Sequence, residues 1–591
     1  MSTQLEYIKL QPDEIRLIRM IDDVPGRVAY ELSVFPLAIA PEYTALSYRW
    51  GEPARTIEII ADGKVLRITN SLNDFLGEVV SRRRSASQKT GWSFRWFWID
   101  AVCINQDDAV ERGEQVAKMK EIYEKAEHMV IWLGEADSGT SDAFDMLEEV
   151  AELECETFKL MDGAMPGISC KLGSDESSVD MLYETLNDDI GGILWSGYWN
   201  RAWIILEAST PKDSLDSGGN CKIWVCCGGF TLAWDVLAEA NKRLLAASWD
   251  NEVEVHAYLH GVANGDIATL KYIQDRRKAQ TFEESLYPML IRSRTSGATD
   301  ARDKVYAIAG LVKTGGDHRL QPNYTLSVED VYIQAAKAIV ESSQSLDSLG
   351  SAGLPRDHNV PSWTPDWTVQ HNTVPQPFYL YDQLWSEDGS VRRTNLFNAS
   401  EGAVPQISFD RNDRCLVARG FCFDTLTTLS VPRTRSSANL PSDDRWRNWT
   451  ETANPDQAKY VAGCTRLEAF KKVLKADVSE VWGDWSAERG STIEGFHHPS
   501  QNAFDFRDAI LDAMTWTRRL FVTRKGYLGL GPSTLEEHDV LCVLFGSQMP
   551  LVLRRQGGDC LFVGQAYVHG LMDGEAIDMS DRQHDEVFSV L

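Results

Sequence analysis

The chain has 591 residues, which is too long for a single hydrophobic core and favours two to four domains. Its 87 acidic residues against 59 basic residues give a formal net charge of −28, which argues against nucleic acid or an anionic membrane surface as a partner. No uncharged apolar run reaches the roughly 18 residues that a membrane helix needs.

The cysteines and the N-terminus indicate the compartment. The first residues, MSTQLEYIKLQPDEIRL, lack the basic-then-apolar layout of a signal peptide. The 11 cysteines show no paired C-x-x-C spacing, and their odd number favours reduced thiols in a cytosolic or nuclear compartment. The histidines give no metal-binding cluster. We therefore expect a cytoplasmic protein without a metal site.

The first third of the chain is typical of an α/β domain. Residues 43–48 form a β-type run, and the Gly and Pro that follow it predict a turn. A hairpin is predicted over 56–68, and then a helix that begins at Asn70 or Ser71.

The stretch 96–134 reads as strand, polar loop, helix and strand. Strands are predicted over 98–103 and 130–133, and Asp108 with Glu111 has the capping-box spacing for a helix between them. Two strands joined by a crossover helix are most economically a parallel βαβ unit. Ligands in such units lie beyond the C-terminal ends of the strands, which here is the polar loop 105–108.

The rest of the chain supports a division into three parts. Helical and strand-like segments continue to about residue 247, a mainly helical stretch follows, and two β-rich stretches near the C-terminus could build one sheet around a helical insertion. The predicted parts are an α/β domain over 1–247 with its core at about 43–210, a helical region over 248–375, and a mixed α+β region over 376–591 with a small sheet or barrel and a helical insertion at about 431–518.

Several motifs together resemble the fungal heterokaryon-incompatibility (HET) domain. They are YTALSYRWG, FWIDAVCINQDD, ERGEQVAKMKEIYEKA, VIWLG and GYWNRAWIILEA. Members of that family usually have Gln where this chain has Leu206. The later segments DARDKVYAIAGL, PSWTPDW, TRKGYLGLGP and YVHGLMDGE resemble the tail of long HET-domain proteins.

This resemblance implies intracellular self/non-self recognition in filamentous fungi, with the HET domain as the trigger of a cell-death response. The implied partners are other incompatibility or regulatory proteins, and the chain could form a homo-oligomer.

A more distant similarity connects the N-terminal domain to TIR domains, and it implies a flavodoxin-like parallel sheet. TIR domains open with a strand that ends in an element like Leu46-Ser47-Tyr48-Arg49. In TIR enzymes that cleave NAD, the key carboxylate lies four residues after a tryptophan, a spacing that Trp203 and Glu207 keep.

The similarity implies NAD as substrate and no required cofactor. Glu207 would be the catalytic carboxylate, near the ribose, where it would orient hydroxyls and stabilise an oxocarbenium-like state. The remaining residues implied to line the site are Ser47, Tyr48, Arg49, Trp50, Gly51, Asp100, Asn105, Gln106 and Trp203.

Each of these residues also has a structural interpretation. Glu207 could be an ordinary carboxylate on a helix surface. Asp100, expected at the end of a strand, could cap the following loop or contact a ribose or an amine. Asn105 and Gln106 could simply pin their loop.

The charged residues nearby could likewise have either a structural role or a role in the site. Arg49 could bind a phosphate bidentately or could stack on Trp50, which with Tyr48 could also form a wall for the nicotinamide ring. Glu111 and Arg112 fit a capping box and a surface ion pair better than a substrate contact.

Three functions follow as hypotheses. The first is a HET protein that degrades NAD, and the second is a non-enzymatic HET signalling module that acts through protein contacts. A different nucleotide-directed hydrolase is a third. The sequence contains no G-x-x-x-x-G-K-[ST] motif and no G-x-S-x-G motif, so it offers neither a P-loop nor a serine nucleophile elbow.

Overall fold

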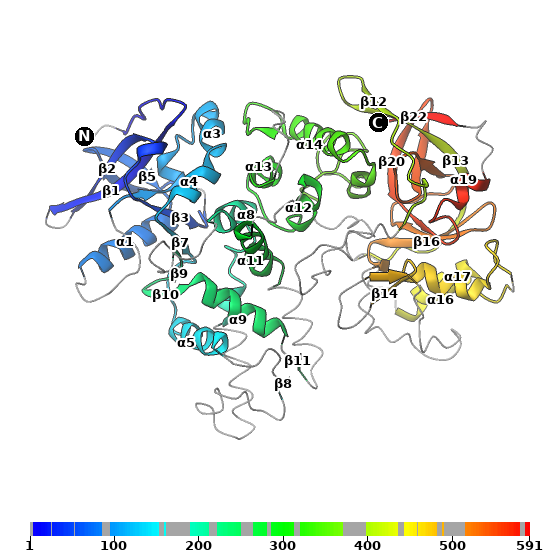
Figure 1. Cartoon of the computed structure of the whole chain (residues 1–591), viewed down its shortest axis with the longest axis horizontal. Coiled ribbons are helices and arrows are strands. Elements are labelled where there is room, and N and C mark those ends of the chain that lie inside the picture. Colours follow the sequence, from blue (N-terminus) through cyan, green and yellow to red (C-terminus); the bar gives the residue numbers. More distant parts are fainter. Residues whose placement is uncertain are drawn as a thin grey trace. The chain divides into compact units, whose positions relative to one another are not determined.

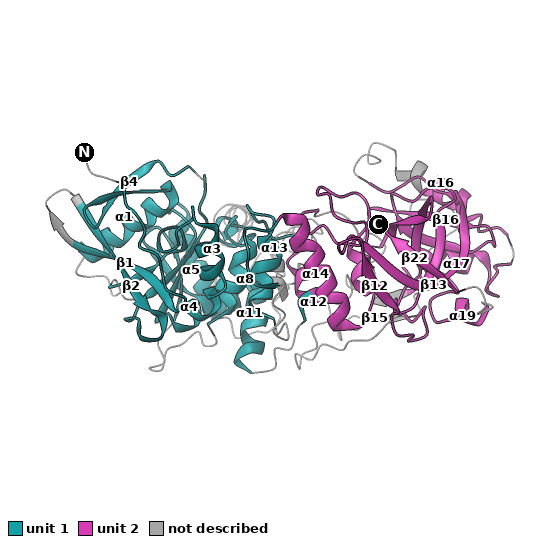
Figure 2. Ribbon diagram, turned by 90° about the horizontal axis from the view of Figure 1, so that it is seen from above, with its two compact units in different colours: residues 1–286, 295–326 teal, residues 287–294, 327–591 magenta. Residues whose placement is uncertain are grey.

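A computed structural model describes residues 4–24, 27–52, 54–84, 95–152, 159–160, 190–211, 222–246, 248–249, 264–279, 285–312, 320–369, 397–434, 442–457, 459–480, 487–489, 514–579 and 585–591. These residues fall into two compact units, 1–286 with 295–326 and 287–294 with 327–591 (Figure 2). Among the described helices, none combines the length and the apolar character that crossing a membrane requires.

The first unit is built on a nine-stranded mixed sheet. Its strands, in spatial order, are β10 (Phe230–Ala233), β9 (Ile223–Cys227), β7 (His128–Trp132), β3 (Thr44–Tyr48), β6 (Phe97–Trp98), β1 (Glu14–Val24), β2 (Arg27–Pro36), β4 (Ile57–Ala61) and β5 (Lys64–Ile68). Strand β3 is buried along its whole length, as expected for a central strand that is covered on both faces.

Four neighbouring strands of this sheet pair with one another in parallel. Strand β3 pairs in parallel with β6 on one side and with β7 on the other, and β7 pairs in parallel with β9. The predicted parallel unit is therefore confirmed, although β3 lies between its two strands. In chain order the four strands are β3, β6, β7 and β9, so their spatial order is second, first, third, fourth.

The remaining strands make the sheet mixed rather than wholly parallel. The long hairpin of β1 and β2 joins the sheet through an antiparallel pairing of β1 with β6. The predicted hairpin over 56–68 is confirmed as β4 and β5. Its turn residues Asp62 and Gly63 have φ of 51° and 73°, the left-handed values that a two-residue hairpin turn requires.

The strand predicted over 98–103 is wrong. Strand β6 ends at Trp98, and Asp100–Cys103 form a short helix, α2. The Ile99 carbonyl accepts hydrogen bonds from the Val102 and Cys103 amides at 3.0 and 2.7 Å. An Asp100 carboxylate oxygen accepts from the Ala101 amide at 2.7 Å. The apolar run was long enough for a strand, but local hydrogen bonds at the start of a helix formed in place of strand pairing.

Helices flank this sheet (Figure 1). The described helices of the first unit include α1 (Asn70–Arg84), α3 (Ala109–Val116), α4 (Met119–Lys125), α5 (Thr140–Ala151), α7 (Gly191–Leu194), α8 (Ala202–Ser209), α9 (Trp234–Ala246), α11 (Asn264–Lys278) and α13 (Asp303–Ala309), of which α11 and α13 pack against α8. The predicted cap at Asp108 is confirmed, since its carboxylate accepts from the Val110 and Glu111 amides. The helix that follows is broken into α3 and α4.

The second unit contains α12 (Leu286–Arg292), α14 (Val328–Ser343) and a C-terminal sheet. The sheet runs through β18 (Val540–Leu544), β19 (Leu551–Gln556), β20 (Asp559–Gln565), β22 (Glu586–Val590), β13 (Cys415–Leu429), β16 (Arg518–Thr523), β17 (Leu528–Pro532) and β21 (Tyr567–Val568), with β12 (Ile407–Asp410) beside β13. Because β13 also pairs with β18, the strands from β18 to β13 close into a ring. The prediction that both β-rich stretches build one sheet or barrel is confirmed.

Helical segments interrupt the strands of the second unit as predicted. Helices α16 (Ser442–Ala453) and α17 (Arg466–Leu474) lie between β13 and β16 in the chain, with a small hairpin of β14 (Val478–Glu480) and β15 (Ala487–Arg489). Residues 490–513 of the predicted insertion lie outside the described residues.

Candidate functional site

Glu207 lies inside the first unit rather than on its surface. It belongs to α8, an eight-residue helix whose residues are almost all buried, and it is 1% exposed. Its carboxylate accepts a hydrogen bond from the hydroxyl of Ser47, which is on the central strand β3. The interpretation of Glu207 as a surface carboxylate is therefore wrong, and its hydrogen-bond partner Ser47 is another of the residues implied to line the site.

Two further side chains complete a polar cluster around this carboxylate. The Ser47 hydroxyl lies 2.6 Å from the Tyr198 hydroxyl. The guanidinium of Arg201 lies 4.0 Å from the Glu207 carboxylate and donates a hydrogen bond to the carbonyl of Tyr48. A buried carboxylate is thus accompanied by one hydroxyl donor and one cation, the two kinds of group that make such burial tolerable.

Burial has an electrostatic consequence for Glu207. It raises the pKa of the carboxyl to about 7, and the Asp100 carboxylate adds to this rise, while Arg201 and the Ser47 hydroxyl oppose it. Burial likewise raises the pKa of Asp100. A carboxyl with a pKa near neutrality can change its charge under physiological conditions, which is a property of many catalytic groups.

The residues after β3 are placed differently from one another. Tyr48 is 1% exposed, so its ring is part of the core and does not form an open wall. Trp50 is half-buried, and its indole N–H donates to the Asp100 carboxylate at 2.9 Å. Arg49 is exposed, and its carbonyl accepts from the Ser71 hydroxyl at 2.8 Å. Gly51 has a φ of 71°, a left-handed value that ends the strand in a turn.

Comparison with known proteins adds family evidence to this geometry. Residues 43–207 match the family described as Heterokaryon incompatibility protein (HET), and residues 457–590 match the Het-6 beta-barrel domain. This chain is a HET-domain protein. The chain is also 24% identical over 656 residues to "Heterokaryon incompatibility protein 6, OR allele" of Neurospora crassa, covering 93% of this chain and 92% of that protein. No solved structure gave a significant match.

The HET segment has its two ends in contact. It begins just before β3 and ends at Glu207, so the hydrogen bond from Ser47 to Glu207 joins its first strand to its last helix. The barrel match covers β16 to β22, which include four of the five strands of the closed ring, whereas β13 precedes the matched residues.

The loop of the HET domain that holds Asn105 and Gln106 is fixed by its own side chains. The Gln106 amide donates to the Asp100 carbonyl at 2.8 Å, and the Asn105 side-chain oxygen accepts from the Asp107 amide at 3.3 Å. The Asn105 backbone amide donates to Glu111 at 2.7 Å. These bonds fulfil the loop-pinning role that the sequence left open for both residues.

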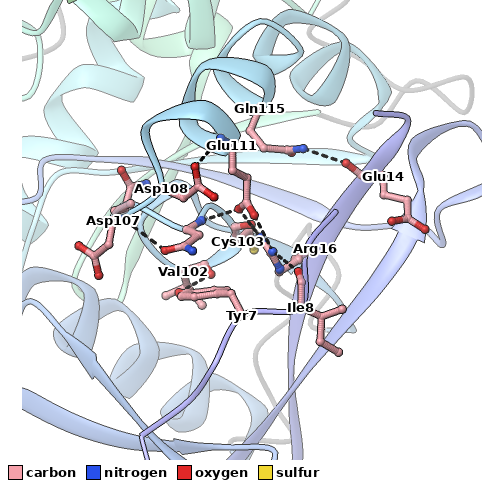
Figure 3. Close-up of polar contacts among 12 residues, drawn as sticks. Tyr7, Ile8, Glu14, Arg16, Val102, Cys103, Asp107, Asp108, Glu111 and Gln115 are labelled. Atoms are coloured by element: carbon pink, nitrogen blue, oxygen red, sulfur yellow. Dashed lines mark hydrogen bonds and ion pairs between the residues drawn. The ribbon is translucent and has the colours of Figure 1, made fainter. Parts of the chain in front are cut away.

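Glu111 is anchored from the opposite side by a buried arginine (Figure 3). Arg16 of β1 meets both carboxylate oxygens of Glu111, at 2.5 and 2.9 Å, and also donates to the carbonyl of Cys103 at 3.1 Å. Glu111 thus forms a buried ion pair and not the predicted capping box, because Arg16 competes for both of its oxygens. Arg112 does form an ion pair, with Asp300 at 3.3 Å.

Trp203, also implied to line the site, points to a different part of the first unit. Its indole N–H donates to the Asp303 carboxylate of α13. The structure therefore brings Ser47 and Glu207 together, and Trp50 with Asp100, whereas Trp203 reaches a different neighbour.

Sequence reasoning missed two members of the cluster. Tyr198 and Arg201 were not among the predicted site residues, although both lie in the motif GYWNRAWIILEA that precedes Glu207. The motif itself was the available signal. Within the described residues, no group of three or more His, Cys, Asp or Glu side chains is arranged to hold a metal ion.

Proposed function

We propose that this protein acts in heterokaryon incompatibility, the process that gives its Neurospora relative its name. We further propose that its HET domain cleaves NAD at the nicotinamide–ribose bond. The observation that carries the catalytic part is the contact between Ser47 and Glu207 beneath the C-terminal end of β3. The spatial order of the four parallel strands supports a TIR-like core, since flavodoxin-like folds share it and bind ligands where the strand order reverses.

In this proposal Glu207 acts as an ionised carboxylate. The bond between the ribose and nicotinamide breaks, nicotinamide leaves with the electron pair, and the positive charge on the ribose is stabilised by Glu207. Water then adds to the ribose and releases a proton, giving ADP-ribose. NAD is the substrate, and the reaction requires no cofactor. Partners are other incompatibility or regulatory proteins, with self-association as a further mode.

One observation favours the non-enzymatic alternative. Glu207 is 1% exposed, so a ribose reaches it only if a covering side chain moves. Arg201, with a side chain that is 19% exposed, is the cluster member nearest to solvent. In the alternative, the cluster only holds α8 against the sheet and the HET domain signals through protein contacts.

Nicotinamide release from NAD by the purified full-length protein distinguishes these functions. We expect turnover by the wild type and a loss of about 10²–10³-fold in kcat for Glu207→Gln. Glu58→Gln, an exposed glutamate of β4 in the same unit, is the matched control and should retain full activity. Absence of turnover in every oligomeric state would exclude the enzymatic function and leave the signalling module.

The pH dependence of kcat tests the role of the carboxylate. Since the pKa of Glu207 is about 7, the ionised form and hence kcat should rise as the pH passes through about 7. Ser47→Ala removes the hydroxyl that lowers this pKa, so the midpoint should move to higher pH. A kcat that falls over this range would show that the protonated acid is the active form.

A further inference from the structure

Helix α8, which carries Glu207, depends on its neighbours for its position. It has eight residues, about two turns, and isolated helices of that length are unstable in water. Its N-cap residue, Arg201, makes no side-chain hydrogen bond to the helix. Strand β3 holds one side of α8 through Ser47, and α4, α11 and a further segment of the chain pack against the rest.

That segment consists of residues 295–312 and 320–326, here called the clamp segment, and it returns to the first unit from α12. Its Gly297 forms a β-bridge with Arg201. The Gly297 carbonyl accepts the first amide of α8, from Ala202, at 2.9 Å, and its amide donates to the Asn200 carbonyl. The clamp segment therefore supplies the helix cap that α8 lacks in its own sequence.

Residues of the clamp segment also contact α8 beyond its first turn. The Asp303 carboxylate accepts from the Trp203 indole and, at 2.7 Å, from the Tyr324 hydroxyl. Gly310 allows a close approach of Leu206, because a Cβ at Gly310 would lie 2.7 Å from a Leu206 methyl carbon. The clamp segment thus contacts α8 at Leu206 and Trp203, which lie one and four residues before Glu207.

The same segment holds α3, the helix that follows the Asn105–Gln106 loop. The Arg112 guanidinium carbon lies 3.6 Å from the centre of the Tyr324 ring, and an Arg112 nitrogen lies 3.3 Å from the Asp300 carboxylate. Arg302 holds both oxygens of Asp300, at 2.8 and 2.7 Å. The clamp segment therefore contacts both α8 and α3.

We infer that the clamp segment positions Glu207, and that Asp303 is a positioning residue which acts through Trp203. The inference rests on the proposed function in treating Glu207 as the reacting carboxylate. It extends the working HET domain beyond residue 207, where the family match ends, to residue 326. The motif DARDKVYAIAGL, residues 300–311, acquires a role in this way.

Hydrogen–deuterium exchange of the full-length protein tests the inference without using activity. In Asp303→Ala, the amides of α8 should exchange about tenfold faster or more, because two hydrogen-bond donors lose a charged acceptor. Asp303→Asn retains one acceptor oxygen and should give an intermediate rate. Helix α5 in the same unit is the internal reference, and Asp145→Asn, an exposed position of α5, is the control variant.

Nicotinamide release by the same variants gives the second readout. Asp303→Ala should lower kcat by about 10- to 100-fold with little change in KM, since a misplaced carboxylate loses its alignment but not the rest of the binding site. Unchanged exchange in α8, equal acceleration in α5, or an unchanged kcat in an active protein would each overturn the inference. If the wild type releases no nicotinamide while α8 alone exchanges faster, the proposed function fails and the clamp remains supported.

Discussion

At the scale of single residues, the buried carboxyl of Glu207 sets the chemistry of the site. Its neighbours are a hydroxyl, a guanidinium and a second carboxylate, and burial outweighs the two stabilising groups. The resulting pKa of about 7 compares with 4.5 in water. The folded state therefore holds this proton more tightly than the unfolded state does.

This difference predicts how stability depends on pH. The contribution of Glu207 is fully present below pH 4.5 and is lost as the pH rises through about 7, because the unfolded chain ionises first. The loss is on the order of 3 kcal/mol, from about 1.4 kcal/mol per pKa unit. The side chain at position 207 cannot ionise in Glu207→Gln. The free energy of unfolding of this variant, relative to that of the wild type, should therefore be higher at pH 8 than at pH 5.

Denaturant midpoints of both proteins at the two pH values measure the effect, since all other titrating groups cancel in the double difference. Glu58→Gln on the exposed hairpin should track the wild type at both values. A difference between Glu207→Gln and the wild type that does not change with pH would show that Glu207 keeps the same proton in the folded and unfolded states.

At the scale of elements, the ion pair of Arg16 and Glu111 joins the first strand to the helix behind the polar loop. The side chains are 1% and 8% exposed, and Glu111 also accepts the Asn105 amide. Glu111→Ala leaves the guanidinium buried without its partner, so we expect a loss of about 3–5 kcal/mol in the stability of the first unit.

An exposed pair in the same sheet provides the control for that prediction. Arg67 and Glu58 lie 3.1 Å apart with side chains that are 56% and 53% exposed. Arg67→Ala should therefore cost less than about 1 kcal/mol. Chemical denaturation of the three proteins gives both values, and similar costs for the two substitutions would contradict the role of burial.

At the scale of the whole molecule, each unit has a sheet of its own, and the second has its own apolar cores. Gly420 lies where β13 pairs with β18, and a Cβ there would sit 2.2 Å from the Val543 carbonyl oxygen. Backbone cannot move aside as a flexible side chain can. Gly420→Ala should cost the second unit about 1–3 kcal/mol and accelerate amide exchange in β13 and β18.

Protection of β3 and β7 in the first unit should be unchanged by Gly420→Ala, because those strands do not share its core. Gly558→Ala, at a turn position with no atom within 4 Å of the added Cβ, should leave both units unaffected. Equal loss of protection in both units would show that they unfold as one.

Local patterns in the sequence were sufficient for much of the fold. The hairpin turn at Asp62-Gly63, the cap at Asp108 and the central strand 43–48 follow from residues that are close together in the chain. The failures occurred where apolar length did not distinguish two structures, as at residues 98–103, or where a distant residue intervened, as Arg16 did at Glu111.

The sequence by itself determined the α/β character of the N-terminal part, a sheet or barrel near the C-terminus and, through its long motifs, the HET family. Only the tertiary structure decided that Glu207 is buried against Ser47, that Tyr198 and Arg201 accompany it, and that Trp203 reaches Asp303. The physical reason is how far apart in the chain the interacting residues are. Turns, caps and strand periodicity depend on neighbours in the chain, whereas burial, charge pairing and the pKa of a carboxyl depend on residues that only folding brings together.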